Sequence, residues 1–340
     1  MKEKEFNRFS RKFEEEIIMR KTRKTIALMF ATVMAMSAMS GCSSNSANTT
    51  TSAETKADDS KAEDVKADGK DTAKDAKADK DMTGSVTAAG SSALKPLVDE
   101  AADLFSEKYP DVSLTIDAGG SGEGLKQVAE GTVNIGNSDV PAEDKLDADK
   151  AKDLVDHQVC VVTMAPIVNP DVKEAGVTTL TKDQLIAIFT GETTNWNEVG
   201  GPDENIVLVT RPTSSGTRAT FQKYALDGKE EASNASMETD DSGVLLQNVK
   251  DTKGAIGYVA LSYLVDDPGV ETVAIDGVEP TLENTYSGAY PVWTFEHMYT
   301  KGEPDEVSGA FLEYIMSDEF GTHMENMGYG VSSKMTKTEH

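Results

Sequence analysis

The sequence is poor in cysteine, histidine and basic residues, and each shortage excludes a class of protein. Its 340 residues include two cysteines, too few for a disulfide scaffold or a cysteine zinc site. Its four histidines show no HExxH or similar spacing, so we expect no metal site and no bound cofactor. The 33 Lys and Arg face 59 Asp and Glu, a formal net charge of −26. This balance excludes a nucleic-acid binder, which needs a basic face, and a protein that gathers anions by its overall field.

A long membrane-spanning segment is also lacking. The apolar stretch at residues 25–40 is short and rich in Ala and Ser, and it follows a basic segment at residues 20–24. Such a pair predicts a secretory signal. The stretch ends in MSGC at residues 39–42, which resembles the lipobox of bacterial lipoproteins.

These features predict how the N-terminal part of the chain is processed. Residues 1–41 form the signal peptide, and we expect translation to begin at Met19 because a signal normally starts close to its initiator. Cys42 becomes the lipid-bearing (palmitoylated) N-terminus; the alternative is a free cysteine behind an uncleaved anchor. Residues 42–83, dominated by Ser, Thr, Ala, Lys and Asp, cannot bury enough apolar surface to order themselves, so they predict a disordered tether.

From Gly84 onward, short apolar runs alternate with amphipathic stretches. The pattern predicts strands at 85–88, 112–117, 132–136, 158–168, 205–210, 254–259 and 290–299. It predicts helices at 93–108, 124–130, 181–189, 217–226, 307–316 and 318–327. Strands that alternate with helices imply an α/β fold with a mostly parallel sheet. We expect Cys160 and Trp196 to be core residues.

Four strand-to-helix junctions share small hydroxyl residues, and most contain Gly. They lie at residues 89–93, 119–124, 136–139 and 211–218. Unpaired backbone N–H groups and the positive end of the helix dipole meet at such a junction, and together they bind anions. One such loop alone is ordinary N-cap chemistry. Four of them, the last holding Arg211 and Arg218, the only arginines beyond residue 23, predict a small oxyanion held by neutral donors and a guanidinium.

Three segments carry a family resemblance. TAAGSSALKPL, IDAGGSGEGLKQVAEGTVNIGNSDVP and VTRPTSSGTRATF resemble, in order and spacing, the phosphate-binding proteins of phosphate-specific ABC importers, and the likeness extends over residues 84–333. The resemblance implies a two-lobe periplasmic-binding-protein type II fold with a hinge and a ligand cleft. Lobe 1 would comprise 84–163 plus 288–340 and lobe 2 would comprise 164–287, with chain crossings near 158–168 and 287–298.

The resemblance also implies which residues bind phosphate. The matching positions are Ser92, Ala93 (through its N–H), Ser121, Asp139, Arg211, Ser215, Gly216 (through its N–H) and Thr217. Some relatives carry an acidic residue where this chain has Thr213, so the arginine loses one orienting partner. The role of Arg218 stays open between a ligand contact and bracing of an acidic surface.

Asp139 bears on selectivity. A carboxylate beside an anion helps only if the ligand still holds a proton to donate, which phosphate does and sulfate at neutral pH does not. The alternative is that Asp139 caps the next helix.

The resemblance implies a non-enzymatic, monomeric lipoprotein on the extracytoplasmic face of a bacterial membrane. It would hand inorganic phosphate to a membrane permease with a separate ATPase, since no GxxxxGK[ST] occurs in the chain. The main alternative is a binding protein for tungstate, molybdate or sulfate. A hydrolase with Ser215 as nucleophile is disfavoured because GxSxG is absent. An adhesin or sensor that keeps the fold stays open.

Overall fold

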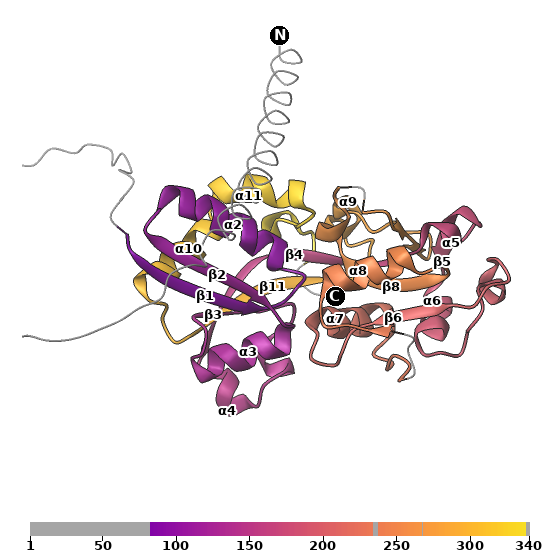
Figure 1. The fold of residues 1–340 in the computed structure, drawn as a ribbon, viewed down its shortest axis with the longest axis horizontal. Helices are drawn as coiled ribbons and strands as arrows, with labels where there is room; N and C mark the ends of the chain where they lie inside the picture. The colour runs from indigo at the N-terminus through magenta and orange to yellow at the C-terminus, as the bar shows by residue number, and fades with distance from the viewer. Residues whose placement is uncertain (1–81, 234–236, 267, 338–340) are drawn as a thin grey trace, which may run out of the picture. The chain divides into compact units, whose positions relative to one another are not determined.

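The computed structural model describes residues 82–233, 237–266 and 268–337 (Figure 1). The predicted signal peptide, Cys42 and nearly all of the tether lie outside the described residues. Within the described ranges, none of the helices has both the length and the apolar character needed to cross a membrane.

The first half of the main sheet contains three parallel strands and one antiparallel strand. These are β1 (Gly84–Gly90), β2 (Val112–Ala118), β3 (Ile135–Ser138) and β11 (Trp293–Lys301). β1 pairs with β2 and β3 in parallel, and β11 pairs with β3 in the opposite direction. The helices α2 (Lys95–Lys108), α3 (Ser121–Glu130), α10 (Glu306–Ile315) and α11 (Asp318–Met324) belong to this half, as does the short α4 (Ala148–Ala151).

The helix α2 illustrates how the sequence pattern becomes packing. Leu97, Val98, Ala101 and Phe105 recur at helical spacing and are fully buried or nearly so. Burial of each large apolar side chain contributes about 1.5–3 kcal/mol. A proline in the first turn starts the helix without the loss of a hydrogen bond. The helix ends at Lys108, and its C-cap Tyr109 lies directly before a second proline.

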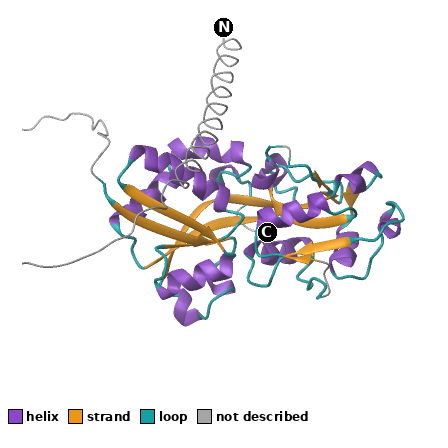
Figure 2. Ribbon diagram, viewed as in Figure 1, coloured by secondary structure: helices purple, strands orange, loops and turns teal. Residues whose placement is uncertain are grey.

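The second half of the sheet has parallel strands of its own, β6 (Val207–Thr210), β7 (Met237–Glu238) and β8 (Ala255–Ala260). Its longer helices are α6 (Lys182–Phe189), α7 (Gly216–Ala225) and α8 (Ser242–Asp251). Shorter elements complete it: α5 (Pro170–Glu174), α9 (Leu282–Tyr286), β9 (Glu271–Thr272) and the pair β5 (Thr179–Leu180) and β10 (Ala274–Ile275). Figure 2 shows helices beside the strands in both halves.

One long strand joins the two halves. β4 (Leu154–Val168) pairs with β11 as far as Thr163 and with β8 from Met164 onward. The resulting strand order is β2-β1-β3-β11-β4-β8-β6-β7, with β9 alongside β4. A second chain crossing lies next to Met164, whose N–H donates to the Val292 carbonyl (2.9 Å) and whose carbonyl accepts from the Tyr290 hydroxyl (2.8 Å).

Most predicted elements are present within a few residues of the expected bounds. The sheet is more mixed than expected, because both long strands β4 and β11 run antiparallel to their neighbours. The helices α4, α5, α8 and α9 were not predicted. Cys160 and Trp196 are fully buried, as predicted, and the Trp196 Nε1–H donates to the Gly254 carbonyl (2.9 Å).

Candidate functional site

The four predicted loops come together where the two sheet halves meet. Backbone bonds join the three loops of the first half: Ser91 N–H donates to the Asn137 carbonyl (2.9 Å), and Gly120 N–H donates to the Gly90 carbonyl (2.9 Å). The fourth loop belongs to the second half and is reached by Gly122 N–H, which donates to the Ser214 carbonyl (3.0 Å). Loops as far apart in the chain as residues 89–93 and 211–218 thus form one cluster.

Arg211 is a fully buried cation between the two halves. Its Nη2 donates to the Ser92 hydroxyl (3.1 Å) and to the Asp240 carbonyl (2.6 Å), and its Nη1 donates to the Ser242 hydroxyl (2.9 Å). Its Nε is buried and has no hydrogen-bond partner among the described residues. A guanidinium held in this way keeps fixed donors for a planar or tetrahedral oxyanion.

Asp139 is the buried acid of the cluster, with 1% of its surface exposed. Its N–H donates to the Ser121 hydroxyl (3.0 Å), and its Oδ2 accepts from the Thr217 hydroxyl (2.7 Å). Its Oδ1 has no partner among the described residues. The helix-cap alternative is wrong, because the next helix is a 3₁₀ turn capped by Pro141 without a side-chain bond.

The N-terminus of α7 packs directly against this acid. A Cβ atom added to Gly216 would lie 2.2 Å from the Ser121 hydroxyl and 3.0 Å from the Asp139 Cβ. Ser215 is the N-cap of α7, and its hydroxyl accepts from the Arg218 N–H (3.2 Å). The first loop is placed by Tyr329, whose hydroxyl donates to the Ala93 carbonyl (2.5 Å).

Most of the chain is similar to known proteins. A family model described as a PBP superfamily domain matches residues 71–319. Over 244 residues the chain is 53% identical to the phosphate-binding protein PstS of Bacillus subtilis, and the match covers 72% of this chain and 79% of that protein. The chain belongs to the phosphate-binding protein family.

Solved structures agree with this family. A protein from Clostridium perfringens, described as a phosphate ABC transporter substrate-binding protein with bound phosphate, is 32% identical with a TM-score of 0.66, covering 73% of this chain and 99% of that chain. An ABC-type phosphate transport receptor from Vibrio cholerae, 24% identical with a TM-score of 0.57 and covering 72% and 99% of the two chains, shares the fold. Membership confirms the two-lobe periplasmic-binding-protein fold and the expectation of a binding protein rather than an enzyme.

Sequence reasoning missed one polar residue of this family member's cluster. Ser242 is the first residue of α8, is fully buried, and its hydroxyl lies 2.8 Å from the Ser92 hydroxyl as well as against Arg211. The signal was present in the sequence as Asp241-Ser242-Gly243, which has the composition of the other four loops. No helix was predicted there, so the junction went unrecognised.

Arg218 supports the cluster through contacts with the backbone of Arg211 and with two glutamates. Its Nη1 donates to the Arg211 carbonyl (2.6 Å), and its Nε lies 3.6 Å from the carboxylate of the buried Glu231. Its Nη2 lies 3.6 Å from the exposed Glu230 carboxylate. The contacts therefore favour the bracing role that the sequence left open. The Glu231 carboxylate also accepts from the Tyr258 hydroxyl (2.7 Å), and burial raises the pKa of Glu231 to about 7 despite that bond and the charge of Arg218.

This raised pKa predicts a pH-dependent stability. Between pH 4.5 and about 7 the native state holds a proton that the unfolded chain has lost, so the free energy of unfolding falls as pH rises through this window. The shift corresponds to about 3 kcal/mol. Glu231→Gln cannot titrate and should lack this decline. Urea unfolding of both proteins at about pH 5 and about pH 8 measures it; an identical pH dependence in the two proteins would refute the assignment.

Gly216 allows a second prediction, because its missing side chain is what lets α7 approach Ser121 and Asp139. Gly216→Ala should weaken phosphate binding about five- to 150-fold, since overpacking of a tight contact costs roughly 1–3 kcal/mol. Gly321→Ala is the matched control, because a Cβ atom there meets nothing within 4 Å. Calorimetric titration of both variants measures the effect, and wild-type affinity in Gly216→Ala would contradict the packing described here.

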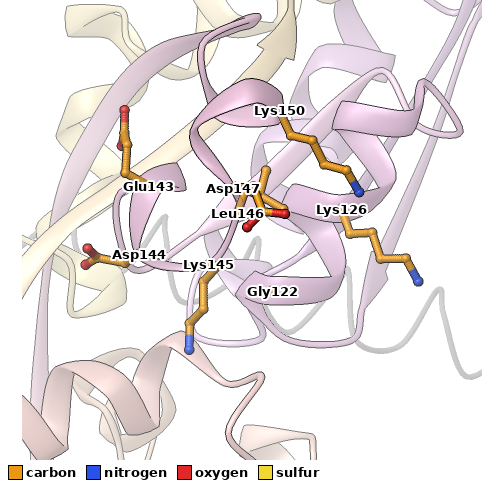
Figure 3. A pocket seen from close by; sticks show the side chains of 8 residues that line it. All are labelled: Gly122, Lys126, Glu143, Asp144, Lys145, Leu146, Asp147 and Lys150. Atoms are coloured by element: carbon orange, nitrogen blue, oxygen red, sulfur yellow. The ribbon is translucent and has the colours of Figure 1, made fainter.

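Lys145 makes a further contact between the two halves. Its Nζ donates to the Thr213 carbonyl (2.8 Å) and to the Ser215 carbonyl (3.4 Å), and burial lowers its pKa. Lys145 also borders a pocket of about 420 Å³ beside α3 and α4, in which it points away from Lys126 and Lys150 (Figure 3). None of the eight predicted phosphate-binding residues lines this pocket, so the pocket is separate from the predicted phosphate site.

Proposed function

We propose that the protein captures inorganic phosphate between its two lobes and delivers it to the permease of an ABC importer, which a separate ATPase drives. The observation that carries the proposal is the buried polar cluster of Arg211 and Asp139. The Arg211 Nε is a buried donor and the Asp139 Oδ1 is a buried acceptor, and neither atom has a hydrogen-bond partner among the described residues. The 53% identity to a phosphate-binding protein supports the same ligand.

The proposed ligand set surrounds this pair. It comprises Ser92, Ala93, Ser121, Asp139, Arg211, Ser215, Gly216 and Thr217, to which we add Ser242 because its hydroxyl contacts both Arg211 and Ser92. Hydrogen bonds to charged groups contribute about 1.5–3 kcal/mol each, so about ten of them can offset the dehydration of phosphate. Hydroxyls suit the task because they donate or accept as the ligand's protonation requires.

The two-lobe organisation supports a closing motion around the ligand. We place lobe 1 at 84–163 plus 288–340 and lobe 2 at 164–287, because β4 changes partners between Thr163 and Met164. The second crossing bonds to Met164, so both crossings meet at one place and form a compact hinge. The contacts of Lys145 and Gly122 with the 211–218 loop are then contacts of the closed form.

The N-terminal features complete the proposal. Cleavage after residue 41 would leave Cys42 to carry the lipid, and the polar tract to residue 83 would hold a monomeric receptor at the extracytoplasmic face of the membrane. Mass spectrometry of the mature N-terminus tests this: a lipid-modified peptide beginning at Cys42 is expected, and an unmodified peptide spanning residues 39–45 would exclude the anchor.

Calorimetry tests the ligand. The purified protein, stripped of endogenous ligand, is titrated with phosphate, sulfate, molybdate and tungstate. We expect tight binding of phosphate and rejection of sulfate. Tighter binding of one of the metal oxyanions or of sulfate would make the protein a receptor for that ion, and absence of binding for all four would refute the proposal.

A further inference from the structure

A second buried acid lies beside Asp139 and is not part of the proposed ligand set. β11 pairs with β3 through His297↔Ser138 and Met298↔Asn137, so continuing this antiparallel register past the end of β3 would set Glu296 opposite Asp139. The two acids also interact electrostatically. Side chains alternate between the faces of a strand, which places both acids on the same face. Glu296 is fully buried.

Neither carboxylate oxygen of Glu296 receives a hydrogen bond from the described residues, and the Oδ1 of Asp139 receives none either. Two ionised carboxylates would leave three acceptors unsatisfied and two like charges side by side, a costly arrangement in a dry interior. A proton on Glu296 removes the repulsion and supplies a donor. The unpaired oxygens therefore fit a hydrogen bond that a protonated Glu296 would donate to Asp139.

Within the described ranges, no cation contributes to the electrostatic environment of Glu296. It interacts electrostatically with the Asp139 carboxylate and the Tyr329 hydroxyl, and with the Cys160 thiol of the residue opposite it on β4. Burial raises the pKa of Glu296 well above its usual value, and the negative charge of Asp139 raises it further. These surroundings favour the neutral form of Glu296.

We propose that Glu296 is a specificity-determining positioning residue: as a neutral acid it donates its O–H to the Asp139 carboxylate and holds that carboxylate as the acceptor for a protonated ligand oxygen. This inference rests on the proposed function. A carboxylate offers about four acceptor sites, so Asp139 can accept from Thr217, from Glu296 and from the ligand together. A neutral Glu296 adds no negative charge next to the anion, whereas an ionised Glu296 would add one.

Two variants separate this role from a merely structural one. Glu296→Gln keeps a donor and the size of the side chain and cannot ionise, while Glu296→Met keeps the size and has no donor. His297→Gln is the matched control, because the neighbouring His297 bonds to Asp156 and not to Asp139. Phosphate and sulfate affinities are measured by calorimetry from about pH 6 to about pH 9, a range that stays below the ordinary pKa of tyrosine. Thermal unfolding shows that each variant is folded.

At the acidic end of the range, Glu296→Gln should bind phosphate within about threefold of wild type, whereas Glu296→Met should bind about tenfold or more weakly, the loss expected for one hydrogen bond to a charged group. The preference of Glu296→Met for phosphate over sulfate should fall together with its phosphate affinity. With rising pH, wild type should lose affinity relative to Glu296→Gln as Glu296 ionises. The ionisation of phosphate itself cancels in that ratio.

The outcomes are distinguishable from a failure of the proposed function. If wild type binds no phosphate, the proposed function is wrong and this inference falls with it. If wild type binds phosphate but both Glu296 variants keep wild-type selectivity and the ratio stays constant with pH, the function stands and the role of Glu296 is refuted. A loss of phosphate affinity in His297→Gln equal to that in Glu296→Met would also refute it, because the effect would then not pass through Asp139.

Discussion

Replacement of Arg211 by Met is expected to lower the affinity for phosphate by about 10²- to 10⁴-fold. Two parallel donors to an anion contribute about 1.5–3 kcal/mol each, and about 1.4 kcal/mol corresponds to a tenfold change. Arg211 is fully buried, and its guanidinium already contacts a hydroxyl from each half of the sheet.

Arg211→Lys refines the test. A lysine keeps the charge but cannot present a planar pair of donors, so its affinity should lie between those of wild type and Arg211→Met. Lys223→Met, a change on the α7 helix away from the cluster, controls for loss of a positive charge in an acidic protein. Calorimetry gives the affinities. If the Arg211→Met protein is folded and binds phosphate like wild type, the guanidinium does not contribute to phosphate binding.

Replacement of Asp139 by Asn should change selectivity more than any other substitution. The carboxylate accepts a hydrogen bond from a ligand that carries a proton and repels an anion that carries none. A site built around such a hydrogen bond can discriminate by 10⁴–10⁵-fold. An amide can donate to an unprotonated oxygen. We therefore expect weaker phosphate binding and a phosphate-to-sulfate ratio reduced about a hundredfold or more.

Competition titrations with the two anions measure this ratio. Asp144→Asn is the matched control, because it removes the same charge from an exposed position on the turn that follows Asp139. If Asp139→Asn retains wild-type selectivity while Arg211→Met has lost affinity, the anion site is correct but the proton-based discrimination is not.

The loops were predictable from sequence because their signals are local. A Gly, a small hydroxyl residue and a following amphipathic stretch mark a helix start wherever it lies in the fold. The same local rule would have found Ser242, but α8 has few apolar residues on its buried face, chiefly Leu245 and Val249, so its periodicity was weak. Ser215, the N-cap of α7, is an example of this local chemistry.

Other features depend on contacts between distant segments and leave no local trace. The directions of β4 and β11 follow from how the chain returns between lobes, so the mixed sheet could not be seen in either strand's composition. Glu296 has the sequence context of an ordinary strand residue, and only the pairing of β11 with β3 places it beside Asp139. The bracing of Arg211 by Arg218 likewise required the fold of the 211–218 loop.

A crystal structure of the protein grown with phosphate tests the central claim most directly. The account predicts one phosphate ion between the lobes, with its oxygens within hydrogen-bonding distance of the Ser92 and Ser121 hydroxyls, the Arg211 guanidinium and the Asp139 carboxylate. Phosphate bound elsewhere on the molecule, with these four side chains not in contact with it, would contradict the account.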